Sequence, residues 1–252
     1  MNPRERVMLA LDHKEPDRIP IDLGATIVSS IAKRTYIELK QYLDMPLEDI
    51  KMLDYVQQLP YVDEALLQRF DVDFRLVQLP AATTSGLNIF EEGGYYAFYD
   101  RWGSKLHMPQ TGGFYFDWVD FPIKEATMSE LDNYHWPRPD PAEVNAQLGR
   151  QAKALYENTD FALVGSAVIG GGIFEQPARV MGLENFLMAL LTAPAFADRL
   201  METITDIYIE SCNLYLEHVG PYIQVFTYWD DLTGQNGWII NPEVYRKLIK
   251  PK

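Results

Sequence analysis

A short apolar run that leads into a polar loop and then into a capped helix is the feature that most constrains this fold. The run covers residues 222–226, and two adjacent carboxylates, Asp230 and Asp231, follow it. A helix is predicted to begin next, with Asn241 as its N-cap and Pro242 at its first position, because these residue types favour those places. Strand, polar loop and helix in this order are typical of parallel α/β enzymes, which hold their chemistry at the C-terminal ends of the strands.

Two earlier segments repeat the strand-like pattern. Residues 72–79 and 161–168 are short and apolar, and helical patterns separate them from each other and from 222–227. Strands that alternate with helices predict a parallel α/β sheet. Three core strands are too few for a closed eight-stranded barrel, which typically takes about 250 residues without additions. Because the sequence stops abruptly at Lys252, we expect an incomplete TIM (β/α)8 barrel, with a smaller open α/β fold as the alternative.

Two regions depart from this alternation of strands and helices. Residues 1–70 are predicted to be helical: Asn2 caps the first helix, and Ser29 and Ser30 offer caps for the next. Residues 86–122 hold short aromatic runs separated by glycines, which predicts an antiparallel β-meander inserted into the barrel. Further helices are predicted at 63–70, 141–156, 174–181, 183–191 and 195–219.

A chain of 252 residues is long enough for one large core or two small domains, and we expect a single domain, residues 1–252. The formal net charge is −14, which repels phosphate backbones and argues against a nucleic-acid partner. No apolar stretch reaches the ~20 residues of a membrane span, and the N-terminus lacks the apolar core of a signal peptide. We therefore expect a cytoplasmic protein without a membrane partner. Since Cys212 is the only cysteine, an internal disulfide and a cysteine-rich metal site are excluded.

The loop after residue 227 holds the first candidate site. Asp230 and Asp231 are candidate catalytic residues, because one carboxylate can move a proton while the other binds an N–H group of a ligand. Adjacent residues at a strand end point in different directions, so we expect different roles, or one as a loop cap and the other solvated. Candidate substrate-binding residues in this loop are Tyr228, Trp229, Gln235 and Asn236, although Asn236-Gly237 is also an ordinary turn signal.

The second candidate site follows the strand predicted at 161–168. Gly171, in a run of three glycines, is a candidate for binding an anionic group through backbone N–H groups. The alternative is that glycine lets a helix approach the strand closely. Glu175 and Gln176 come next, where a barrel keeps its site residues. No metal site is expected within the chain, because no histidine or cysteine has a second ligand at metal-binding spacing.

Three stretches of the chain carry a family resemblance. They are residues 4–20 with their Glu15-Pro16-Asp17-Arg18-Ile19-Pro20 segment, 100–103 with the later Trp136-Pro137, and 230–251. In these stretches the chain resembles the uroporphyrinogen decarboxylase superfamily, and more narrowly its branch close to corrinoid-dependent methyltransferases. The resemblance implies a TIM barrel with its site at the C-terminal mouth, a small-molecule substrate and a homodimer.

The chain departs from the true decarboxylases at two places. Their arginine-rich stretch, which grips the carboxylates of the substrate, corresponds here to residues 21–26, where no arginine is present. Their aspartate after the first strand, which contacts pyrrole N–H groups, is also missing, since the strand ends Gln78-Leu79-Pro80. Both departures count against uroporphyrinogen decarboxylation.

The methyltransferase branch implies a zinc ion and a corrinoid protein as partner, with zinc ligands that would follow Lys252 in a His-x-Cys motif and a later cysteine. No cofactor is therefore expected within these residues themselves. We expect methyl transfer between a small methylated compound and a corrinoid protein. The alternatives are uroporphyrinogen III decarboxylation in tetrapyrrole synthesis and a ligand-binding protein without catalysis.

Overall fold

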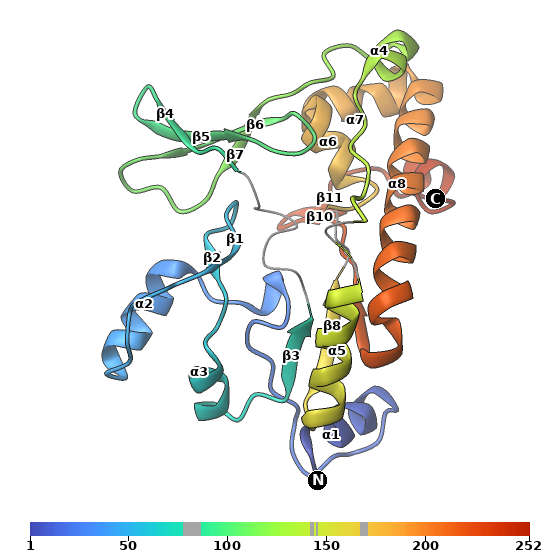
Figure 1. The fold of residues 1–252 in the computed structure, drawn as a ribbon. Helices are drawn as coiled ribbons and strands as arrows, with labels where there is room; N and C mark the ends of the chain where they lie inside the picture. Colours follow the sequence, from blue (N-terminus) through green and yellow to red (C-terminus); the bar gives the residue numbers. More distant parts are fainter. Residues whose placement is uncertain (78–86, 142–143, 145, 167–170) are drawn as a thin grey trace. The chain divides into compact units, whose positions relative to one another are not determined.

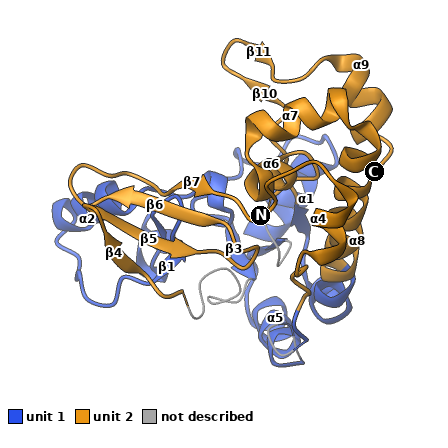
Figure 2. Ribbon diagram, turned by 90° about the horizontal axis from the view of Figure 1, so that it is seen from above, with its two compact units in different colours: residues 1–85, 140–168, 213–227 blue, residues 86–139, 169–212, 228–252 orange. Residues whose placement is uncertain are grey.

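The computed structural model of the chain describes residues 1–77, 87–141, 144, 146–166 and 171–252 (Figure 1). Contacts divide the chain into two compact units (Figure 2). Unit 1 comprises Met1–Ser85, Asp140–Val168 and Asn213–Thr227, and unit 2 comprises Gly86–Pro139, Ile169–Cys212 and Tyr228–Lys252. Because the chain passes back and forth between the units, neither is a continuous segment. The single domain therefore stays a prediction, and each unit is described by itself.

Unit 1 is built on a parallel three-stranded sheet with the order β3-β8-β9. Its strands are β3 (Phe74–Val77), β8 (Ala162–Ser166) and β9 (Val225–Thr227). Val164 of β8 pairs with Leu76 on one side and with Val225 on the other, so the C-terminal ends of the strands meet at one edge. The predicted mixed α/β fold with a parallel sheet is confirmed. The described residues form no closed barrel, and the incomplete barrel stays a prediction.

The helices of unit 1 were predicted from the sequence, but some of them begin or end at other residues than predicted. They are α1 (Pro3–Leu11), α2 (Lys33–Tyr42), α3 (Glu64–Arg69), α5 (Ala146–Asn158) and the last turns of α8 (Pro194–Val219), with 3-10 turns at Ile27–Ser29 and Gly220–Tyr222. Asn2 forms the expected capping box with Glu5. The predicted caps at Ser29 and Ser30 are wrong: Ala32 precedes α2 without a side-chain cap, because Ser29 instead bonds Thr26 within the 3-10 turn.

Further differences concern short elements. A small antiparallel pair, β1 (Met52–Asp54) with β2 (Leu59–Pro60), lies inside the region expected to be helical. The third strand begins at Val225 because a 3-10 turn takes up Tyr222. Some predictions lie outside the described residues. They concern the ends of two strands, the start of one helix, Gly170 and the start of the meander, at residues 78–80, 86, 142, 143, 145 and 167–170.

A buried ion-pair network ties the segment before residue 21 to the start of β3. Asp73 has a fully buried side chain that accepts bonds from Arg6 Nη1 at 2.5 Å, Arg18 Nη1 at 2.6 Å and the backbone N–H of Ile21 at 2.7 Å. Arg6 also pairs with Asp17 at 2.6 Å, and this bond lowers the pKa of Asp17 to about 2. Arginines 6 and 18, which belong to the stretch with the family resemblance, thus have a structural role here.

We expect Gly149→Ala to destabilise unit 1, although alanine is the better helix former by about 1 kcal/mol. A Cβ on Gly149, in α5, would lie 2.9 Å from the backbone oxygen of His218 at the end of α8. Separating the two segments is expected to cost about 1–3 kcal/mol, which exceeds the propensity gain. The free energy of unfolding in urea measures the balance. Gly234→Ala, where no atom lies within 4 Å of the new Cβ, is the control and should change stability little. A net gain at Gly149 would contradict the packing.

Unit 2 contains the predicted β-meander, which is confirmed as an antiparallel sheet in the order β4-β5-β6-β7 (Figure 1). Its strands are β4 (Phe90–Glu92), β5 (Tyr95–Tyr99), β6 (Lys105–Pro109) and β7 (Asp117–Asp120). Gly93 and Gly94 form the two-residue turn between β4 and β5, and both have positive φ, 58° and 86°. Such a turn matches the twist of the strands it joins and favours glycine.

The helices of unit 2 pack around one apolar core. They are α4 (Met128–Asn133), α6 (Glu175–Met181), α7 (Leu183–Thr192), the longer part of α8, and α9 (Pro242–Val244), which continues as a π-helix at Tyr245–Ile249. Helices α6, α7, α8 and the cap of α9 by Asn241 were predicted, whereas no helix was predicted at α4. Thr127 caps α4 by accepting a bond from the backbone N–H of Glu130, a pattern visible in the sequence.

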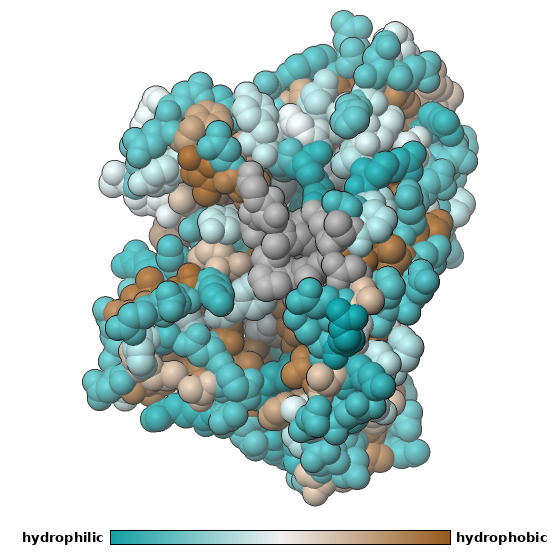
Figure 3. Space-filling model, viewed as in Figure 1, coloured by the Kyte–Doolittle hydropathy of each residue, from teal (hydrophilic) through white to brown (hydrophobic). Residues whose placement is uncertain are grey.

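Within the described residues, no helix is both long and apolar enough to span a membrane. The face drawn in Figure 3 is mostly hydrophilic, with apolar patches between the polar side chains.

Candidate functional site

The two candidate loops of the sequence meet at the start of α6, within unit 2. Asp230 Oδ2 accepts a bond from the backbone N–H of Phe174 at 2.8 Å, and its Oδ1 accepts one from Glu175 at 3.0 Å. Phe174, the N-cap residue of α6, has no capping side chain of its own. Asp230 therefore caps this helix from a distant part of the chain, which is the structural role that a carboxylate at this position can have.

Glycine is required where these loops approach. A Cβ on Gly172 would lie 1.9 Å from Asp230 Oδ1, so any other residue would displace the carboxylate. Gly171 has a φ of +98°, and its Cβ would lie 2.6 Å from Gln176 Oε1 and 3.0 Å from Tyr208 Oη. Both glycines thus allow close packing, but against side chains of a loop and of α6 and α8, and not between a helix and a strand as the sequence suggested. Anion binding by Gly171 stays a prediction.

Three polar atoms on α6 are buried and have no hydrogen-bond partner among the residues that the structure describes. They are Glu175 Oε2, Gln176 Nε2 and Arg179 Nε. Glu175 uses its other oxygen, Oε1, to pair with Arg179 Nη2 at 2.5 Å. Buried polar atoms without partners are rare in folded proteins because each costs free energy. Three of them on neighbouring turns indicate a place where a polar ligand or bound water completes the bonding.

Both carboxyl groups of this cluster hold their protons more strongly than usual. Burial raises the pKa of Glu175 against the opposing effect of Arg179, and the nearby charges of Asp231 and Asp230 raise it further. Burial also raises the pKa of Asp230, although the N–H groups of Phe174 and Glu175 oppose the shift. A carboxyl group whose pKa is raised by burial suits general acid catalysis better than an exposed one does.

The meander holds Arg179 in place. The guanidinium carbon of Arg179 lies 4.5 Å from the ring centroid of Trp118, and Trp118 Nε1 donates to Asp100 Oδ2 at 3.3 Å. The Ser104 hydroxyl donates to the backbone oxygen of Arg179 at 2.6 Å. Asp100 also accepts bonds from the N–H groups of Trp102 and Ser104, so the 100–103 stretch forms a structural turn with Trp102 in the core. The meander thus helps to fix the position of Arg179 in the cluster.

Two tyrosines flank the cluster. Tyr228 Oη accepts a bond from the backbone N–H of Ile173 at 2.9 Å, and burial raises the pKa of this hydroxyl to about 12. Its ring lies edge-on to the buried Tyr208, with centroids 6.4 Å apart. Sequence reasoning named Tyr228 but missed Tyr208 and Arg179. Arg179 was detectable, since it stands four residues after Glu175 on a predicted helix, the spacing of an ion pair. Nothing in the sequence singled out Tyr208.

Among the remaining candidate residues, Asp231 contributes its backbone N–H, which bonds the Asp230 carboxylate and opposes the rise that burial causes in its pKa. Asp231 is exposed, so the two aspartates differ as their adjacency predicted. Gln235 and Asn236 are exposed at the tip of a hairpin between β10 (Thr233–Gly234) and β11 (Gly237–Trp238). Trp229 is partly buried next to Asp230. A role in substrate binding stays a prediction for these residues.

The part of the chain that the structure describes does not offer a metal site. It contains no group of three histidine, cysteine or acidic side chains placed to hold a metal ion. Burial raises the pKa of the Cys212 thiol, which disfavours the thiolate that binds zinc. These residues therefore do not fit the zinc that the family resemblance implies.

Comparison with known proteins finds a similarity to a solved structure. No family model matches the sequence, and no curated protein matches it. A methyltransferase from Methanosarcina mazei has a similar structure, with a TM-score of 0.49 and 13% sequence identity. The match covers 100% of this chain and 65% of that one, so the chain spans about two thirds of its length. Membership of the uroporphyrinogen decarboxylase superfamily stays a prediction.

Proposed function

We propose that the chain is part of an enzyme that transfers a methyl group from a small methylated compound, with Glu175 as the proton donor. The observation that carries this proposal is the half-buried Glu175, whose pKa is raised and whose Oε2 lacks a partner. The family resemblance of the sequence supplies the reaction class and the acceptor, a corrinoid carried by a partner protein. It also supplies the proposed fold, an incomplete TIM barrel.

The proton balance of methyl transfer gives Glu175 a specific task. The bond from the methyl carbon to the donor atom breaks and leaves its electron pair on that atom, while the acceptor supplies the pair for its new bond to carbon. When the donor atom is the oxygen or sulfur of a neutral compound, the departing group becomes an anion unless it takes up a proton. Glu175 Oε2 supplies that proton. A quaternary ammonium donor leaves as a neutral amine and needs none.

Neighbouring residues would orient this reaction. Gln176 Nε2 and Arg179 Nε are donors that an oxygen of the substrate can satisfy. Arg179 Nη2 keeps Glu175 in one position by donating a hydrogen bond to its Oε1, which a protonated carboxyl group also accepts. Asp230 fixes the start of α6, on which all three side chains stand. Asp230 is thus proposed as a positioning residue, and Glu175 takes the catalytic role that the sequence assigned to the aspartates. No step is assigned to zinc, because the described residues do not fit it.

Methyl transfer to free cob(I)alamin tests this proposal. The visible spectrum of the corrinoid follows the transfer from anisole, dimethyl sulfide and tetramethylammonium, each mixed with the protein. We expect the neutral oxygen or sulfur compound to react and the ammonium ion to react more slowly or not at all. Release of carbon dioxide from uroporphyrinogen III without methyl transfer would replace the proposal with decarboxylation. Absence of both reactions would leave a binding protein and overturn the proposal.

A further inference from the structure

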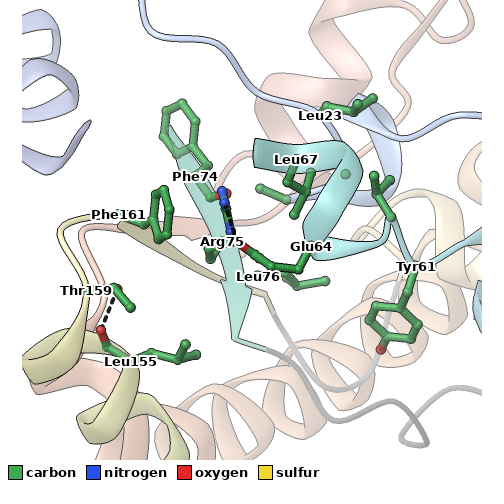
Figure 4. A pocket seen from close by; sticks show the side chains of 13 residues that line it. Leu23, Tyr61, Glu64, Leu67, Phe74, Arg75, Leu76, Leu155, Thr159 and Phe161 are labelled. Carbon is green, nitrogen blue, oxygen red and sulfur yellow. Dashed lines mark hydrogen bonds and ion pairs between the residues drawn. The ribbon is translucent and has the colours of Figure 1, made fainter. Parts of the chain in front are cut away.

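Unit 1 contains a pocket that is separate from the α6 cluster and independent of the proposed function. Its volume is about 440 Å³, within the range of about 300–1,000 Å³ that is usual for ligand pockets. An engineered cavity of about 150 Å³ holds benzene, so this pocket has room for a molecule of two fused rings. Its walls come from β3, α3, the end of α5 and the segments around residues 24 and 62 (Figure 4).

Most of the pocket wall is apolar. The rings of Phe74 and Phe161 lie near each other on one side, and leucine side chains from three segments, Leu23, Leu67 and Leu155, complete the lining (Figure 4). Gly24 has a φ of +79°, and a Cβ there would lie 2.7 Å from Val62 Cγ2. The turn at Gly24 therefore packs closely against Val62, and the wall is formed before any ligand arrives.

The two charges in the wall neutralise each other. Arg75 is buried, and its Nε and Nη2 each donate to Glu64 at 2.8 Å, while Nη1 donates to the backbone oxygens of Val72 and Phe74. The guanidinium carbon lies 3.6 Å from the ring centroid of Phe161. A charged ligand would lose its hydration here without gaining a free counter-charge. The pocket therefore favours a neutral ligand.

The Tyr61 hydroxyl is buried and has no hydrogen-bond partner within the described part of the chain. Burial raises its pKa to about 12, so it stays a neutral donor. In Figure 4, Tyr61 lies on the side of the pocket away from Phe74 and Phe161. A suitable ligand would have an apolar body that packs against the two phenylalanines. It would also carry an oxygen or nitrogen atom that accepts a hydrogen bond from the Tyr61 hydroxyl.

We propose that this pocket is a second binding site, for a neutral, mainly aromatic molecule of about two rings that carries one hydrogen-bond acceptor bound by Tyr61. Equilibrium dialysis of the full chain against three probes of one shape tests it: methyl naphthyl ketone, isopropylnaphthalene and naphthoate. The ketone should bind best, and naphthoate at least about tenfold more weakly. Tyr61→Phe should weaken the ketone about fivefold to tenfold and leave the hydrocarbon unchanged.

Two variants that fill the pocket distinguish it from other surfaces. Leu23→Trp and Leu155→Trp, placed in different walls, should each abolish binding, whereas Leu191→Trp, at an exposed position in α7, should not. The unfolding midpoints show whether each variant is folded. The proposal is overturned if the wild-type chain binds neither neutral probe, if folded filled variants still bind, or if naphthoate binds more tightly than the ketone.

Discussion

Asp73→Asn is expected to lower the free energy of unfolding by about 3–5 kcal/mol, the usual cost of breaking a buried ion pair by removing one partner. The side chain of Asp73 is completely buried and bonds two arginines and a backbone N–H group. Asparagine keeps one oxygen but turns an N–H group toward the guanidinium groups, which cannot accept it. Arg6, whose side chain is only 8% exposed, then loses a neighbouring negative charge.

Asp71→Asn is the matched control. This carboxylate pairs with the same Arg18 at 2.7 Å, but its side chain is 81% exposed. Exposed ion pairs contribute at most about 1 kcal/mol. Asparagine also tolerates the φ of 52° at this position. Urea unfolding of both variants measures the difference, and equal losses for Asp73 and Asp71 would mean that burial does not determine the strength of this network.

This network also shows where prediction from the sequence stops. Periodicity and capping residues identify α1, α7, α8 and the meander, because these features are local. The sequence gives no indication that Arg6, Arg18 and Asp73 meet, since their contact depends on how distant segments pack. The same limit applies to Ser29, whose hydroxyl has two local partners to choose from. It bonds Thr26 rather than capping α2.

The sequence likewise predicted some features of the candidate site and not others. Strand ends followed by polar loops directed attention to Glu175, Gln176 and Asp230, and the structure brings Asp230 to the start of α6, where the other two stand. Their roles in a reaction stay predictions. Which of these residues has a structural role could not be predicted, because Asp230 bonds backbone N–H groups of α6 that lie 55 and 56 residues earlier in the chain. That contact leaves Glu175 as the carboxyl group with a free oxygen.

Glu175→Gln is expected to lower kcat for methyl transfer by about 10²- to 10⁴-fold, the usual contribution of a general acid. The amide keeps the size of the side chain but has no acidic proton. The same variant should alter the pH dependence of stability. Because the pKa of Glu175 is raised above 4.5 in the fold, its favourable contribution is full below pH 4.5 and is lost as pH rises through the raised value. Glutamine has no such loss, so the stability of the variant relative to wild type should increase with pH over this range.

Glu184→Gln, an exposed glutamate in the first turn of α7, is the control and should leave both measurements nearly unchanged. Together, kcat and the pH dependence of stability distinguish a catalytic role of Glu175 from a structural one. A purely structural Glu175 that served Arg179 as an ion-pair partner would make the glutamine variant less stable at neutral pH and leave kcat within a few-fold of wild type. A large loss of kcat together with a relative gain of stability at higher pH is expected if burial raises the pKa of Glu175 and the reaction uses its proton.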